Sequence, residues 1–154
     1  MSKHTAHVTW SRNGATFTDN KYSRVHRWKF DGGAEVSGSA SPHVVPLPMS
    51  SAEAVDPEEA FVAAVSSCHM LWFLSLAADK KLTVDSYDDQ AIGMMGRIAQ
   101  GRLGITKIEL HPKIVFSGTQ PTTEEIQALH HEAHERCFIA NSLNSEIVIE
   151  PPAR

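Results

Sequence analysis

The chain has 154 residues, a length that suits one domain over residues 1–154 with a core of its own and is too short for two domains of ordinary size. Its 14 basic and 18 acidic side chains give a formal net charge of −4, and no basic run could follow a phosphate backbone, which argues against a nucleic-acid partner. The first residues contain neither an apolar signal segment nor a lipidation motif, so the expected location is the cytoplasm.

The first third of the chain is predicted to be β-structure followed by a loop. Segments 7–11 (HVTWS) and 15–19 (ATFTD) are strand-like, and residues 25–39 are predicted to form a hairpin around the turn 31–33 (DGG). Residues 41–55 contain three prolines, which cannot donate to the hydrogen bonds of a sheet, so this stretch is expected to be irregular.

A long helix is predicted next. Asp56 is a good N-cap, Pro57 suits the first helical position, and Glu58 and Glu59 complement the positive helix end. Residues 61–78 are nearly as long and apolar as a membrane span. Three serines and a histidine interrupt this run, and no second such run is present, so a helix enclosed by protein is the preferred interpretation over a membrane span.

A second helix and more strands complete the pattern. A capping box of Thr122 and Glu125 opens the helix, and its apolar stripe continues to Cys137. The remaining strand-like stretches are 84–100, 104–118 and 146–150. The order β-β-β-α-β-β-α-β predicts an α+β fold in which largely antiparallel sheets cover a long buried helix.

The two cysteines are the most informative single residues. Cys68 and Cys137 lie far apart among apolar neighbours, which in a reducing compartment argues against a permanent disulfide, and either could be a small core residue. Cys68 lies about three turns into its helix, beyond the reach of the helix dipole, and apolar burial would disfavour its thiolate. A reactive Cys68 therefore needs positive charge from elsewhere, and Arg24 and Arg27 are the main candidates, with His69 a weaker local one.

Two motifs resemble those of a known family. Residues 56–68 (DPEEAFVAAVSSC) resemble the helix start of the OsmC and Ohr family of thiol peroxidases, and residues 134–142 (HERCFIANS) resemble its second cysteine segment. The order of elements agrees over nearly the whole chain. The resemblance implies an OsmC-like fold, an intertwined homodimer, and reduction of organic hydroperoxides without a metal or other cofactor. Phe138 stands where many relatives have proline, which indicates a distinct branch.

The resemblance also implies roles for individual residues. Carried over by position, Cys68 is the peroxidatic cysteine and Cys137 the resolving cysteine. Counting back from the hairpin turn favours Arg24 as the site arginine, with Arg27 the next candidate, and Glu58 as its carboxylate partner. An external dithiol, a dihydrolipoyl group by the same resemblance, would reset the cysteines. Apolar side chains near Cys68 would favour organic peroxides over hydrogen peroxide: Phe61, Met70, Trp72 and Phe73.

The spacing of Glu58 and Cys68 leads to a separate expectation. Ten residues of continuous helix correspond to about 15 Å of rise, too far for both side chains to serve one peroxide group. Nothing between them predicts a break in the helix. If Glu58 belongs to the site, it must therefore reach Cys68 of a second chain, which predicts composite sites at a dimer interface.

Three other interpretations remain open. His130, His134 and Cys137 could bind a metal, although histidines at 130, 131 and 134 are expected on a solvated helix face. The same fold could hold a small apolar ligand beside the long helix, with two inert thiols. A Cys-His hydrolase using Cys68 would leave Cys137 without a role. A zinc assay separates the metal site from a peroxidase, and thiol reactivity at acidic pH separates the ligand-binding module from it.

Overall fold

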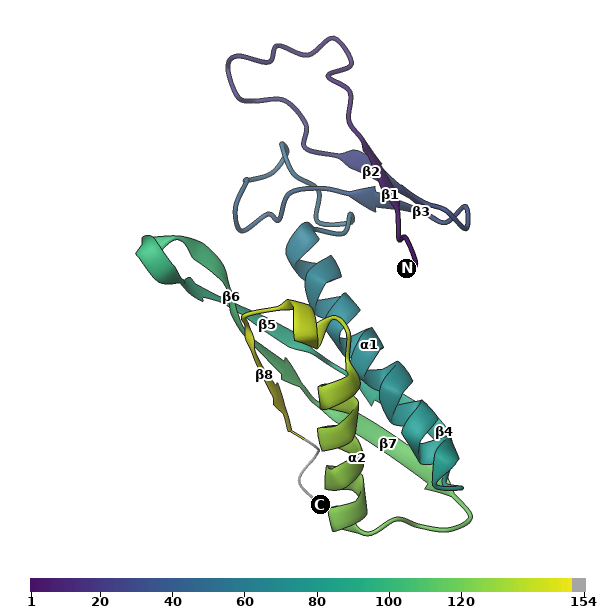
Figure 1. Ribbon diagram of the computed structural model, residues 1–154. Coiled ribbons are helices and arrows are strands. Elements are labelled where there is room, and N and C mark those ends of the chain that lie inside the picture. Colours follow the sequence, from purple (N-terminus) through teal and green to yellow (C-terminus); the bar gives the residue numbers. More distant parts are fainter. Residues whose placement is uncertain (151–154) are drawn as a thin grey trace. The chain divides into compact units, whose positions relative to one another are not determined.

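The computed structural model describes residues 1–150, which form two compact units, one from Met1 to Ala60 and one that begins at Phe61 (Figure 1). The strands are β1 (Ala6–Thr9), β2 (His26–Phe30), β3 (Glu35–Gly38), β4 (Thr83–Asp89), β5 (Ile92–Arg97), β6 (Leu103–Leu110), β7 (Pro112–Ser117) and β8 (Glu146–Ile149). The α-helices are α1 (Pro57–Asp79) and α2 (Thr123–Arg136), and the short 3-10 helices are η1 (Ala99–Gly101) and η2 (Ala140–Ser142).

The first unit contains a three-stranded antiparallel sheet in the order β1-β2-β3. Strand β1 confirms the predicted strand at 7–11, and β2 and β3 confirm the hairpin at 25–39. The predicted strand at 15–19 is wrong, because this segment belongs to a loop. Asn13, Gly14 and Asn20 on either side of it all have positive φ, which turns the backbone and prevents an extended strand from continuing.

The segment before α1 is irregular as predicted, and it fixes where the helix begins. The Val55 N–H donates to the Ser37 carbonyl at 2.9 Å, which ties the end of the loop to the first sheet. Asp56 then caps α1: its Oδ1 accepts from the Glu59 N–H at 2.7 Å, and its own N–H donates to Glu59 Oε2 at 3.1 Å. This reciprocal capping box confirms the predicted helix start.

The second unit contains two small sheets. Strands β4 and β7 pair in antiparallel fashion, while β6 pairs antiparallel with β5 and parallel with β8. Each predicted strand-like stretch, 84–100 and 104–118, is therefore two strands rather than one. The second stretch breaks at His111, whose N–H donates to Asp89 Oδ1 at 2.7 Å instead of joining a sheet.

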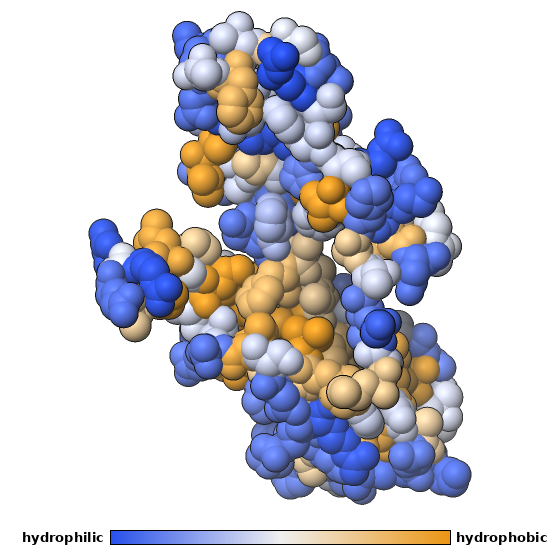
Figure 2. Space-filling model, turned by 45° about the horizontal axis from the view of Figure 1, so that its top comes forward, coloured by the Kyte–Doolittle hydropathy of each residue, from blue (hydrophilic) through white to orange (hydrophobic). Residues whose placement is uncertain are grey.

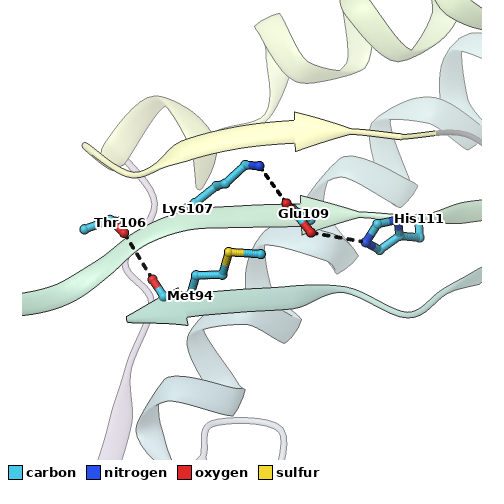
Figure 3. Close-up of polar contacts among 5 residues, drawn as sticks. All are labelled: Met94, Thr106, Lys107, Glu109 and His111. Atoms are coloured by element: carbon cyan, nitrogen blue, oxygen red, sulfur yellow. Dashed lines mark hydrogen bonds and ion pairs between the residues drawn. The ribbon is translucent and has the colours of Figure 1, made fainter. Parts of the chain in front are cut away.

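Strand β6 shows how the second sheet divides between solvent and core. Its side chains Ile108 and Leu110 are fully buried. Figure 3 shows polar side chains on this strand and just after it: Lys107 Nζ lies 2.6 Å from Glu109 Oε1, and Nε2 of His111, the residue that follows the strand, lies 3.7 Å from Glu109 Oε2. Such surface ion pairs add little to stability. The alternation leaves one face of the strand apolar and available to pack on the helices.

The core of the second unit consists of two clusters to which α1 contributes on both sides. In one cluster Phe73 packs with α2, and in the other Val65 packs with β6. The predicted apolar stripe of α2 is confirmed, because Leu129, Ala133 and Cys137 are buried. Its capping box is also present, with the Glu125 N–H donating to Thr122 Oγ1 at 3.2 Å.

A single chain encloses α1 on one side only, which differs from the expectation of a helix surrounded by protein. Leu71 is 61% exposed although it lies in the middle of the helix. Figure 2 shows hydrophobic residues, in orange, gathering in the middle of the molecular face. By length and composition α1 could cross a membrane. Polar and core contacts argue otherwise, because Ser66 donates to Asp89, His69 bonds His130, and Phe73 is buried in the protein.

Candidate functional site

The two cysteine side chains meet although 69 positions of sequence separate them. Cys68 is half-buried on α1, and Cys137, at the C-cap of α2, is 1% exposed. Both are free thiols. The two thiols are close enough for Cys68 to contribute to the raised pKa of Cys137. The site therefore combines one accessible thiol with one enclosed thiol.

The environment of Cys137 strongly favours its protonated form. Burial raises the pKa of the Cys137 thiol to about 11, and the hydrogen bond with Cys68 acts in the same direction. The backbone N–H of Ala140 donates to its sulfur at 3.4 Å and opposes the rise without cancelling it. At neutral pH Cys137 is thus a thiol, and Cys68 is the more accessible of the two cysteines.

Aromatic and cationic groups lie beside the two cysteines. Phe138, 69% exposed, makes an edge contact with Trp72 at a centroid distance of 5.5 Å. The Arg136 guanidinium lies 5.7 Å from the centre of the Trp72 ring and also pairs with Glu132 at 2.6 Å. Sequence reasoning missed Arg136 and Phe138 as neighbours of the site, although both adjoin Cys137. Phe73, by contrast, is a fully buried core residue and is not available to a substrate.

The expectation that His130 lies on a solvated helix face is wrong. His130 is 4% exposed, and its Nδ1 lies 3.0 Å from Nε2 of His69, which is 1% exposed. The buried side of α2 therefore includes a polar residue as well as the apolar stripe. Of the three histidines predicted to face solvent, His131 is exposed, His134 is half-buried and His130 is buried. Within residues 1–150, no group of three or more His, Cys, Asp or Glu side chains could hold a metal ion, so the metal interpretation has no support there.

Arg24, the favoured site arginine, is held by neutral groups of its own unit. Its guanidinium donates to the Asn20 carbonyl at 3.0 Å, to Asn20 Oδ1 at 2.7 Å and to the Tyr22 carbonyl. It also lies 3.8 Å above the centre of the Tyr22 ring. The backbone is fixed as well, because the Arg24 N–H donates to the Met49 carbonyl at 2.7 Å and its carbonyl accepts from His26 Nδ1 at 2.8 Å. Among the residues that the structure describes, these neutral groups orient the cation and no carboxylate pairs with it.

The other two candidates are placed differently. Arg27 is exposed and its guanidinium lies 3.4 Å from Glu35 Oε2 in a surface ion pair. Glu58 is half-buried in the first turn of α1, and within residues 1–150 no ion pair joins it to Arg24. Because α1 is continuous from Pro57 to Asp79, Glu58 and Cys68 of one chain are about 15 Å apart along the axis. Composite sites between chains stay a prediction.

Comparison with known proteins identifies the family. The model of the family described as OsmC-like protein matches residues 50–151, about two thirds of the chain and both cysteine segments. The chain belongs to the OsmC-like family. An OsmC-like protein of unknown function from Vibrio cholerae is 55% identical, with 99% of this chain and 100% of that chain covered and a TM-score of 0.97. Among proteins of curated function, none matches the chain significantly.

More distant OsmC-like structures share the fold. The organic hydroperoxide resistance protein of Elizabethkingia anophelis is 22% identical, covering 98% of this chain and 94% of that one, with a TM-score of 0.71. The OsmC-like protein of Mycoplasma pneumoniae is 16% identical, covering 98% and 96%, with a TM-score of 0.74. These similarities confirm the predicted α+β OsmC-like fold. The fold is thus shared with a protein whose name refers to organic hydroperoxide resistance.

Proposed function

We propose that this OsmC-like protein is a cysteine-based peroxidase that reduces organic hydroperoxides. The observation that carries the proposal is the contact between Cys68 and Cys137, because it places a second thiol beside the accessible one. A sulfenic acid formed at Cys68 would have a partner within reach and would not need to wait for an external thiol. Family membership and the fold shared with organic hydroperoxide resistance proteins support the same chemistry.

In the first step, the Cys68 thiolate attacks one peroxide oxygen and the O–O bond breaks. Cys68 becomes a sulfenic acid, and the departing alkoxide takes up a proton to leave as an alcohol. The family resemblance assigns Arg24 the stabilisation of the thiolate and of the charge on the departing oxygen. The same resemblance assigns Glu58 the orientation of that arginine, and the 15 Å rise between Glu58 and Cys68 implies that two chains share the site.

In the second step, the Cys137 sulfur attacks the sulfenic sulfur of Cys68. Water leaves with the Cys137 proton, and an intramolecular disulfide remains, so Cys68 is protected from further oxidation. The raised pKa of Cys137 makes it a poor competitor for peroxide in the first step, because little of it is thiolate. In the second step its proton passes to the departing hydroxide of the adjacent sulfenic acid as the S–S bond forms. An external dithiol then reduces the disulfide by exchange, and a dihydrolipoyl group is the candidate that the resemblance supplies.

The surroundings of the cysteines favour a peroxide with an apolar substituent. Trp72 and the exposed Phe138 form an aromatic pair next to the enclosed thiol. An alkyl or aryl group would bury apolar area there, whereas hydrogen peroxide gains nothing from it. We therefore propose organic hydroperoxides as the preferred class.

The function is tested by mass spectrometry after one equivalent of cumene hydroperoxide, under non-reducing conditions. We expect the wild type to lose two hydrogens, which map to a bridge between Cys68 and Cys137. Cys137→Ser should stop at a sulfenic acid that an added dimedone probe captures, and Cys68→Ser should not react. Two unmodified thiols after minutes of exposure would reject the peroxidase and favour a non-catalytic module that binds a small apolar ligand.

We propose further that the working unit is a homodimer that covers the open side of α1. Several large apolar side chains of the second unit are exposed to solvent, and exposed apolar area of this kind supports an interaction surface. They include Leu71, Met95, Leu103 and Phe138. Leu71→Arg is expected to shift the protein from dimer to monomer mass in light scattering, because an unpaired charge would be buried at the interface. Gln127→Arg is the control, because it adds the same charge at an exposed position of α2, and this variant should stay dimeric. If both variants keep the mass of the wild type, the interface lies elsewhere.

A further inference from the structure

Two buried histidines join α1 to α2. His69 Nε2 and His130 Nδ1 are 3.0 Å apart, and the two rings lie nearly parallel, with 9° between their planes and 5.3 Å between their centroids. This side-chain hydrogen bond links the two helices directly. Buried polar side chains are generally hydrogen-bonded, and each of these two rings has the other as its partner.

The pair is neutral in the folded protein at physiological pH. Burial lowers the pKa of His69 to about 3, and the nearby His134 acts in the same direction. Burial lowers the pKa of His130 to about 4, while the Asp89 carboxylate partly opposes this change. One ring therefore donates its N–H and the other accepts. The outer nitrogens, His69 Nδ1 and His130 Nε2, are buried and have no hydrogen-bond partner among residues 1–150, so the mutual bond is the main polar contact of both rings there.

The pair and the two cysteines are successive contacts of the same two helices. His69 directly follows Cys68 on α1, and Cys137 lies two helical turns beyond His130 on the buried stripe of α2. The two contacts involve neighbouring residues on α1 but residues seven positions apart on the α2 side. Together they restrict both the rotation and the sliding of one helix against the other. A disulfide needs this precision, since the two Cβ atoms must lie about 3.5–4.5 Å apart and a slide of one residue is about 1.5 Å.

We propose that His69 and His130 are positioning residues for the Cys68–Cys137 couple. Their hydrogen bond holds α1 and α2 in the register at which the two thiols can close into a disulfide. Two leucines would fill the same space without the cost of burying polar atoms, but apolar contacts are not directional and would allow the helices to slide. The inference rests on the proposed function only in taking the disulfide to be the oxidised state.

The test measures how readily the disulfide forms without peroxide. The protein is equilibrated anaerobically with glutathione buffers, in which one oxidised glutathione and two thiols give one protein disulfide and two reduced glutathiones. The equilibrium constant is the effective concentration of Cys137 at Cys68, read by alkylation and mass spectrometry with the intrachain bridge mapped. His130→Asn keeps a polar atom where the imidazole Nδ1 stood, whereas His130→Leu removes the bond. His131→Leu changes the exposed neighbour on the same helix as a control.

We expect His130→Leu to lower the effective concentration at least tenfold, and His130→Asn and His131→Leu to stay within about threefold of wild type. A folded His130→Leu with the wild-type value would overturn the proposal. A tenfold lower effective concentration in His130→Asn would overturn it too. The asparagine variant therefore tests the proposal even if the leucine variant does not fold. A protein that forms the disulfide normally but ignores peroxide would reject the proposed function while leaving this inference intact.

Discussion

Acidification from pH 7.5 to pH 5 is expected to lower the free energy of unfolding by about 4 kcal/mol through His69 and His130 alone. Both have folded-state pKa values far below the ordinary 6.5, near 3 and 4. Between pH 6.5 and about 4 the unfolded chain therefore binds more protons than the folded one, and stability falls as the pH falls. At pH 5 each histidine contributes about 2 kcal/mol to this loss, which stops growing below the folded-state values.

Urea unfolding followed by circular dichroism at several pH values, at one protein concentration, measures this loss. The control is the double variant His69→Gln with His130→Asn, in which two amides replace the imidazoles and neither titrates. Its stability should change by about 4 kcal/mol less over the same interval, since the contributions of other groups are common to both proteins. Equal losses in the two proteins would show that the pair is not buried and neutral in solution.

Replacement of Arg24 by methionine is expected to slow alkylation of Cys68 at pH 6 by about 10- to 1,000-fold. An opposite charge within a few ångströms favours the ionised form of a group by one to three pKa units, and only the thiolate is alkylated. Methionine keeps an unbranched side chain over the Tyr22 ring but carries no charge. The rate of peroxide consumption should fall at least as far, because the same guanidinium would stabilise the departing oxygen.

Arg27→Met is the matched control for this experiment. Arg27 lies three residues away in an exposed ion pair with Glu35, so its loss should change the alkylation rate by less than about threefold. If Arg27→Met slowed alkylation of Cys68 more than Arg24→Met did, Arg27 would be the site arginine. Two unaffected rates would mean that neither arginine acts on Cys68, and Arg136, next to Cys137, would become the next cation to test.

Local features of the fold could be predicted from the sequence because their causes are local. Asp56 with Glu59, and Thr122 with Glu125, cap their helices through bonds spanning three residues, so the letters alone suffice. The failed strand at 15–19 has β-branched and aromatic residues, but flanking turns with positive φ overrode that preference. The break at His111 depends on Asp89, 22 positions earlier, and no local pattern shows it.

The features of the candidate site also differ in whether they could be predicted from the sequence. The pairing of Cys68 with Cys137 was expected from the family resemblance, since nothing local brings two such distant residues together. Burial of His130 was missed because its partner, His69, lies 61 positions earlier, and HHEAH by itself has the polarity of an exposed face. The neutral partners of Arg24 come from a loop whose conformation depends on Asn20 in the left-handed region.

The enclosed position of Cys137 has a consequence for how long an oxidised molecule would last. A reductant arriving from solvent can reach only the Cys68 sulfur of a disulfide, because Cys137 is 1% exposed. That attack must expel the Cys137 sulfur, and a thiol with a pKa of about 11 is a poor leaving group. Common monothiols would therefore reduce the bridge slowly. The disulfide form would therefore outlast the peroxide that produced it, until a dithiol able to dock at Cys68 reduced it.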